Sequence, residues 1–169
     1  MKLSTLETVF NALNQANIHY LVAGGIAVNI HGYQRMTADL DLVIQLNSSN
    51  IINAMNCLNE LGYQPLVPVT ATDFADPEKR KNWIETKHMQ VLSLQSQQYP
   101  ETTIDIFVTE PFNFDDAYKS ATIADLAPNI NFRLVNIPTL IKMKQEAGRA
   151  KDLDDIEHLQ MILREENSE

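Results

Sequence analysis

The sequence GGIAVNIHGYQRMTADLDLVI, which begins at Gly24, limits the possible fold more than any other part of the chain. Asp39 and Asp41 alternate with apolar residues over 39–44, and this period of two is typical of a strand with one buried face. A pair of glycines, Gly24 and Gly25, comes first, with 13 residues between Gly25 and Asp39. The pattern predicts a glycine turn, a short helix and then a strand with two carboxylates on one face.

The remaining patterns predict an α/β (α+β) fold, with strands and helices mixed over about the first 110 residues and mostly helices afterwards. Helices are expected over 4–16, 26–33, 47–63, 138–147 and 151–163, and strands within 18–25, 38–46, 89–95, 103–108 and 132–137. Ser4 and Glu7 form a capping-box pattern, and Pro77 suggests the start of a short helix. The stretch 63–87 gives the weakest signal.

The length of the chain and its lack of a linker segment suggest two parts that pack together. We expect a core over 1–110 and a C-terminal strand with helices over 111–169, packed on the core as one unit, because no clean linker separates them. The 169 residues suffice for one compact domain.

Charge and cysteine content exclude several classes of protein. The net charge of −9 argues against binding bulk nucleic acid through counterion release. The single cysteine, Cys57, rules out an internal disulfide and fits a reducing compartment. No apolar run is long enough to span a bilayer, and the first residues do not resemble a signal peptide. We therefore expect a cytoplasmic protein without a membrane partner.

Two carboxylates on one face of a strand suggest a metal site. Asp39 and Asp41 should lie about 7 Å apart on the same face, and their charges repel each other. Hard oxygen ligands suit Mg²⁺ or Mn²⁺, which would remove this repulsion. The alternative is an exposed edge strand with two solvated aspartates.

The glycine pair favours the metal interpretation. A strand that runs into Gly24 and Gly25 and then into a helix presents backbone N–H groups at the helix N-terminus. Such a turn binds anions and suits the phosphates of a nucleotide. A phosphate site beside a metal-binding strand is what phosphoryl or nucleotidyl transfer requires.

A third acid is expected to complete the site. Asp105 lies between Ile104 and Ile106 in a second alternating strand pattern. If this strand lies beside the one that carries Asp39 and Asp41, three carboxylates can hold two cations about 3.5–4 Å apart.

These three motifs together resemble the DNA polymerase β-like nucleotidyltransferase superfamily: Gly24-Gly25, Asp39-Leu40-Asp41 and Ile104-Asp105-Ile106. With the late sequence RAKDLDDIEHL, the chain looks most like the small bacterial branch that includes AbiEii-type abortive-infection toxins. The resemblance covers most of the chain except 63–87. It implies a mixed twisted sheet flanked by helices, with the C-terminal helices packed on it.

The resemblance implies a Mg²⁺-dependent enzyme that moves a nucleoside monophosphate from an NTP, such as ATP, to an acceptor hydroxyl. Asp39, Asp41 and Asp105 would be the metal ligands and catalytic acids, and Gly24 and Gly25 would hold phosphates. The acceptor would be a tRNA, a protein or a small molecule such as an aminoglycoside- or lincosamide-like drug. A cognate partner protein of a toxin–antitoxin pair is also implied.

Further residues are candidates for contact with the nucleotide. Arg35 and Thr37 lie four and two residues before Asp39, and the resemblance lets Lys144 approach a phosphate. A second Asp-Leu-Asp, at Asp152 and Asp154, begins a helix, where residues two apart point to different sides. We expect Asp152 to be an N-cap rather than a metal ligand.

Two functions of other classes remain open. One is a non-catalytic module of the same fold that binds a partner in a toxin–antitoxin-like system. The other is a plain acidic α/β interaction domain. Mg²⁺-dependent binding of an NTP separates the enzyme from the interaction domain, because the former requires it and the latter excludes it.

Overall fold

The computed structural model describes residues 1–169, which form a mixed seven-stranded sheet with eight helices. The strands are β1 (Tyr20–Ala23), β2 (Asp39–Ile44), β3 (Tyr63–Pro65), β4 (Val91–Ser96), β5 (Thr103–Phe107), β6 (Thr122–Ala127) and β7 (Ile130–Leu134). The helices are α1 (Leu3–Gln15), α2 (Gly24–His31), α3 (Ser48–Glu60), α4 (Ala71–Ala75), α5 (Pro77–Lys87), α6 (Phe114–Lys119), α7 (Ile137–Ala147) and α8 (Ala150–Glu166).

The sheet has the order β3-β4-β5-β2-β1-β7-β6, with β2 at its centre. β2 is antiparallel to β1 and parallel to β5, and the β2–β5 register places Asp41 directly opposite Asp105. β7 pairs in parallel with β1, so the C-terminal part of the chain adds two strands to the sheet begun by the N-terminal part.

A single core of 34 buried hydrophobic residues holds the sheet and helices together. Alternation on β2 and β5 places Leu40, Leu42 and Ile106 in this core without solvent exposure. On α1, Phe10 stacks on Phe132 of β7 with ring centroids 4.5 Å apart. Burying each such side chain contributes about 1.5–3 kcal/mol, so the core fixes which face of each central strand is left for polar residues.

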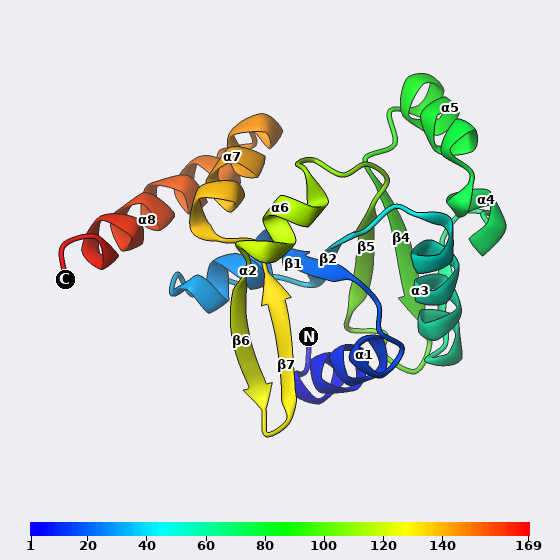
Figure 1. Cartoon of the computed structure of the whole chain (residues 1–169), viewed down its shortest axis with the longest axis horizontal. Coiled ribbons are helices and arrows are strands. Elements are labelled where there is room, and N and C mark those ends of the chain that lie inside the picture. Colours follow the sequence, from blue (N-terminus) through cyan, green and yellow to red (C-terminus); the bar gives the residue numbers. More distant parts are fainter.

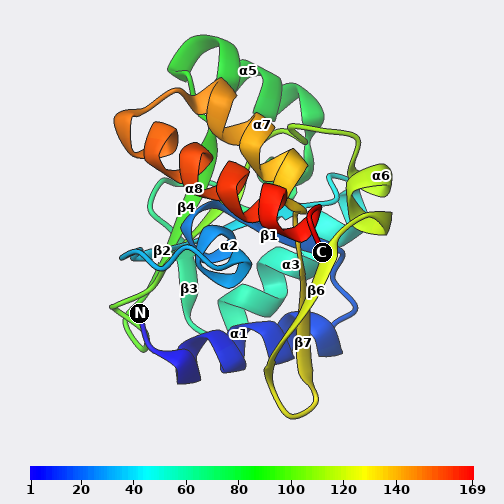
Figure 2. The same cartoon turned by 90° about the vertical axis from the view of Figure 1, so that its left-hand side faces the viewer.

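Figures 1 and 2 show α7 and α8 lying side by side next to α2, with the central strands between them and α1. Gly148 separates α7 and α8, and its positive φ of 64° allows the turn between them. His31 at the end of α2 shares a hydrogen bond of 2.8 Å with the backbone oxygen of Val135, which precedes α7. The α7–α8 pair is therefore placed against the glycine turn that begins α2.

The structure confirms the predicted α/β class and the main elements, with differences at several positions. α5 begins at Pro77 as predicted, and Asn47 caps α3 through its side chain. The predicted capping box of Ser4 is wrong, because α1 begins at Leu3 and Lys2 occupies the N-cap position. β3, β6, α4 and α6 were not predicted.

None of the helices combines the length and the apolar character needed to cross a membrane.

Candidate active site

Asp41 and Asp105 lie side by side on one face of the sheet. They are register partners on the parallel strands β2 and β5, and neighbouring strands lie about 4.8 Å apart. Asp39 lies two residues before Asp41 on the same face and is exposed, whereas Asp41 and Asp105 are half-buried. The predicted convergence of Asp105 on the β2 acids is therefore present in the backbone register.

The environment of the pair disfavours negative charge. Burial, followed by repulsion from Asp105 and Asp39, raises the pKa of Asp41 from 3.8 to about 7. Burial and the charge of Asp39 also raise the pKa of Asp105, although Ser93 on β4 partly offsets them by donating a hydrogen bond of 2.6 Å to Asp105. A cation bound at this point would relieve the repulsion.

The glycine turn lies directly against the acids. Gly24 has a φ of 62°, which favours glycine, and a Cβ at this position would lie 1.9 Å from Oδ2 of Asp41. A Cβ on Gly25 would lie 2.6 Å from Oγ1 of Thr37. No side chain caps the N-terminus of α2, whose N-cap residue is Ala23. Backbone N–H groups at a helix N-terminus thus lie next to Asp41, where an anion is stabilised.

A buried network of charges joins α7 and α8 to the segment before β2. Arg35 donates two hydrogen bonds, of 2.6 and 2.9 Å, to the carboxylate of Asp155. Lys144 Nζ lies 2.7 Å from Asp155 and 3.2 Å from Asp152, and Arg149 Nε lies 2.7 Å from Asp152. Lys144, Asp152 and Asp155 are buried.

This network carries one net positive charge, because three cations face two carboxylates. Burial alone would raise the pKa of Asp152, but hydrogen bonds from Arg149 and Lys144 outweigh burial and hold the pKa at about 2. The charges of Lys144 and Arg149 also act to lower the pKa of Asp41, so the network lies close enough to influence the acids. It supplies positive potential on the side of the acids formed by α7 and α8.

The predicted N-cap role of Asp152 is wrong. Arg149 occupies the N-cap position of α8, and Asp152 lies three residues later, where its side chain accepts from the Arg149 backbone N–H. Asp152 and Asp155 lie three residues apart on one helical face and point inward to Lys144, whereas Asp154 is exposed. The need to neutralise a buried lysine explains this difference.

The candidate nucleotide-binding residues occupy different environments. Thr37 packs against Gly25 and precedes β2. Arg35 and Lys144 are held by Asp155, and their contact with a nucleotide stays a prediction. Sequence reasoning missed the roles of Ser93 and Asp155. Ser93 carried a detectable signal, because it alternates with the buried Leu92 and Leu94 and therefore faces the same side of the sheet as its register partner Asp105.

Asp41 and Asp105 are the carboxylates best placed to hold a divalent cation. The structure contains no group of three or more His, Cys, Asp or Glu side chains arranged to hold a metal ion. The Asp41–Asp105 pair nevertheless fits Mg²⁺, which keeps several waters and takes one or two carboxylates. Burial and repulsion from neighbouring acids raise both pKa values, and a bound cation would oppose these effects. The role of Asp39 as a third ligand stays a prediction.

No protein-family model matches the sequence, and no curated protein matches it significantly. Solved structures do match the fold. Lincosamide antibiotic adenylyltransferase LnuA, determined with lincomycin bound, superposes with a TM-score of 0.57 at 13% identity, over 90% of this chain and 92% of that chain. The chain has the nucleotidyltransferase fold.

Two further structures share the nucleotidyltransferase fold. ANT(2'')-Ia in complex with adenylyl-2''-tobramycin matches with a TM-score of 0.56 at 11% identity, over 98% of this chain and 97% of that chain. An antigenic nucleotidyltransferase-like protein from Paracoccidioides brasiliensis matches with a TM-score of 0.54 at 18% identity, over 93% and 74%. The resemblance to polymerase β-like nucleotidyltransferases is thus confirmed for the fold, and the AbiEii-type branch stays a prediction.

Proposed function

We propose that this protein is a nucleotidyltransferase that moves a nucleoside monophosphate from an NTP to a hydroxyl of an acceptor. The observation that carries the proposal is the in-register pair Asp41 and Asp105, with the Asp41 carboxylate directly against Gly24. Acids that repel each other and a turn that favours anions form one continuous surface. An NTP with its divalent cation has the complementary charges.

Each group has a role in this proposal. The α2 N-terminus at Gly24 and Gly25 binds phosphate oxygens, and the network around Lys144 adds positive potential. Asp41 and Asp105, with Asp39, would hold Mg²⁺ or Mn²⁺. Such a cation neutralises phosphate charge and lowers the pKa of a coordinated hydroxyl.

We favour a small, hydroxyl-bearing acceptor. The fold matches include a structure with lincomycin and one with adenylylated tobramycin, and the net charge of −9 is unfavourable for a long nucleic acid. An acidic surface attracts cationic acceptors, so an aminoglycoside-like molecule fits better than tRNA.

The test uses label position. The full chain is incubated with Mg²⁺ and each common NTP, labelled on the α- or the γ-phosphate, with aminoglycosides, lincosamides, tRNA or cell lysate as acceptors. Transfer of the α-label but not of the γ-label is expected, and its loss in Asp105→Asn. If neither label is transferred and NTP does not bind, the protein is not an enzyme of this class.

A further inference from the structure

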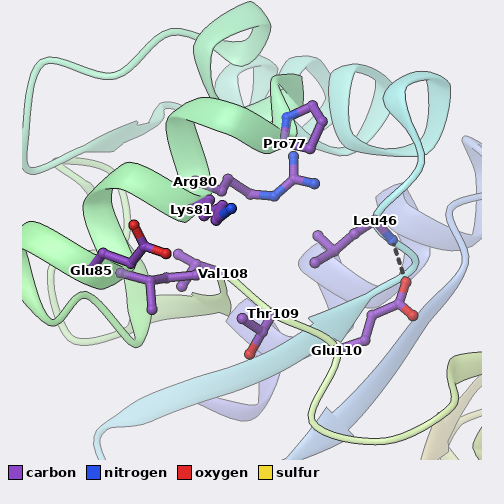
Figure 3. Close-up of a pocket in the computed structure, with 9 residues that line it drawn as sticks. Leu46, Pro77, Arg80, Lys81, Glu85, Val108, Thr109 and Glu110 are labelled. Carbon is purple, nitrogen blue, oxygen red and sulfur yellow. Dashed lines mark hydrogen bonds between the residues drawn. The ribbon is translucent and has the colours of Figure 1, made fainter.

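A second pocket lies away from the candidate active site, between α5 and the segments that follow β2 and β5 (Figure 3). Its volume is about 460 Å³, and Leu46, Arg80, Lys81 and Thr109 are among its lining residues. Leu46 follows Asp41 by five residues of mostly extended chain, which corresponds to about 16 Å. The pocket is therefore at the carboxyl ends of these strands, whereas Asp39 begins β2.

Arg80 is the unusual residue of this pocket. It is 8% exposed, and Figure 3 shows its side chain extending from α5 toward the space between Pro77 and Leu46. One guanidinium nitrogen, Nη1, donates to the backbone oxygen of Phe74 in α4. Arg80 takes part in none of the six ion pairs of the chain.

The nearby acids do not neutralise Arg80 by direct contact. Glu85 and Glu110 both line the pocket with Arg80, and neither forms an ion pair with it. Glu110 instead accepts a hydrogen bond of 2.8 Å from the Leu46 backbone N–H. Burial lowers the pKa of Arg80, with the charges of Asp76 and Glu110 partly offsetting this effect. A guanidinium group nevertheless stays protonated in proteins, so a buried positive charge faces the pocket.

A buried charge without an ionic partner is unfavourable, and an anion would compensate it. The planar guanidinium has donors spaced to bind two oxygens of one carboxylate or phosphate group. Lys81 lines the same pocket and supplies a second positive charge, while Thr109 supplies a hydroxyl donor. Leu46 and Ile84 provide apolar walls.

We propose that this pocket binds a phosphate or carboxylate group of a small molecule, between Arg80 and Lys81. The site is separate from the NTP site and does not depend on the proposed function. The contrasting explanation is that Arg80 only ties α5 to the end of α4 through the Phe74 carbonyl.

The test is a titration of the ¹⁵N-labelled full chain with inorganic phosphate and, separately, with acetate, at constant ionic strength set with sodium chloride. Saturable shifts are expected for Leu46, Thr109 and the Arg80 side-chain Nε–H. Shifts confined to Gly24 and Gly25 would indicate phosphate binding at the other site and would overturn the proposal. Saturation by phosphate alone or by acetate alone assigns the ligand class.

Variants on one helix complete the test. Arg80→Gln should weaken anion binding at least tenfold, and Lys81→Ala should weaken it severalfold. Lys87→Ala removes the same charge from the end of α5 outside the pocket and should leave the anion affinity unchanged. If Arg80→Gln does not fold, Lys81→Ala still decides. Equal affinity in wild type and Lys81→Ala, or no saturation by either anion, would overturn the proposal.

Discussion

At the scale of single residues, the site depends on carboxylates held where charge is unfavourable. Asp41 is pressed against Gly24 on one side and Asp105 on the other, and its pKa is raised to about 7. Close approach of the acid is possible because Gly24 lacks a Cβ. A substitution at Gly24 or Gly25 would therefore disturb packing as well as phosphate binding, because Gly25 also touches Thr37.

The raised pKa of Asp41 makes stability depend on pH. Between its ordinary value of 3.8 and about 7, the folded state binds more protons than the unfolded state, so the free energy of unfolding falls as pH rises. Without metal, Asp41→Asn should exceed wild type in stability by on the order of a few kcal/mol at pH 8, and by little at pH 4. Urea unfolding in EDTA at both pH values measures this, with Asp125→Asn on β6 as control. A constant difference across this window would contradict the assignment.

A variant of Asp105 should distinguish NTP binding from nucleotide transfer. Asp105→Asn keeps the shape and the Ser93 contact, so the fold and most NTP affinity should persist. Nucleotide transfer should fall by at least about 100-fold, because in the proposed function Asp105 is a ligand of the cation that activates the acceptor hydroxyl. Steady-state transfer and NTP titration on the same sample distinguish the two effects, and transfer at the normal rate would remove Asp105 from the catalytic residues.

At the scale of elements, the position of α7 and α8 rests on buried ion pairs. Asp155 accepts from Arg35 and Lys144 and has no exposed side-chain surface, whereas Asp154 on the same helix has a side chain 54% exposed. Arg35 and Asp155 are 120 residues apart in sequence, so this pair fastens α8 to the segment before β2. The ion pairs thereby fix the position of α7 and α8 next to the acids and the glycine turn.

Two adjacent acids on α8 test this attachment. Asp155→Asn should lower the free energy of unfolding by about 3–5 kcal/mol, because it leaves Lys144 and Arg35 without their shared partner. Asp154→Asn should cost less than about 1 kcal/mol, since exposed charges contribute little. Denaturant unfolding of both variants measures the contrast, and similar losses would show that the network does not hold α8.

The accuracy of sequence prediction varied between elements for physical reasons. β2 and β5 were predicted because one face of each is fully buried, which imposes strict alternation. β6 has no buried residue and β3 has three residues, so neither produces a period that can be read. α4 and α6 are too short for helical periodicity.

At the scale of the whole molecule, the fold joins acids from distant parts of the chain. The alternation around Asp105 indicated a strand, but it could not show which strand lies beside it. The resemblance predicted that β5 pairs with β2, and the register confirms this pairing. The partners of Arg35 and Lys144 were not predictable, because they depend on how α8 packs rather than on local pattern. Burial of Asp152 and Asp155 is visible in the fold alone.

A divalent cation should stabilise the whole fold, because the acids converge in the folded chain and are apart in the unfolded chain. Mg²⁺ or Mn²⁺ should raise the melting temperature by a few degrees, through preferential binding to the folded state. The response should vanish in Asp39→Asn/Asp41→Asn and persist in Asp125→Asn. A double variant that responds like wild type would place the metal elsewhere.

The most direct measurement is calorimetric titration of the full chain with a non-hydrolysable analogue of each common NTP, with Mg²⁺ and with EDTA. We predict saturable binding of at least one analogue with Mg²⁺, at least tenfold weaker binding in EDTA, and a similar loss in Asp39→Asn/Asp41→Asn but not in Asp125→Asn. Absence of binding to every analogue in Mg²⁺, or equal affinity in the double variant and wild type, would contradict the assignment of Gly24, Asp41 and Asp105 to a nucleotidyltransferase site.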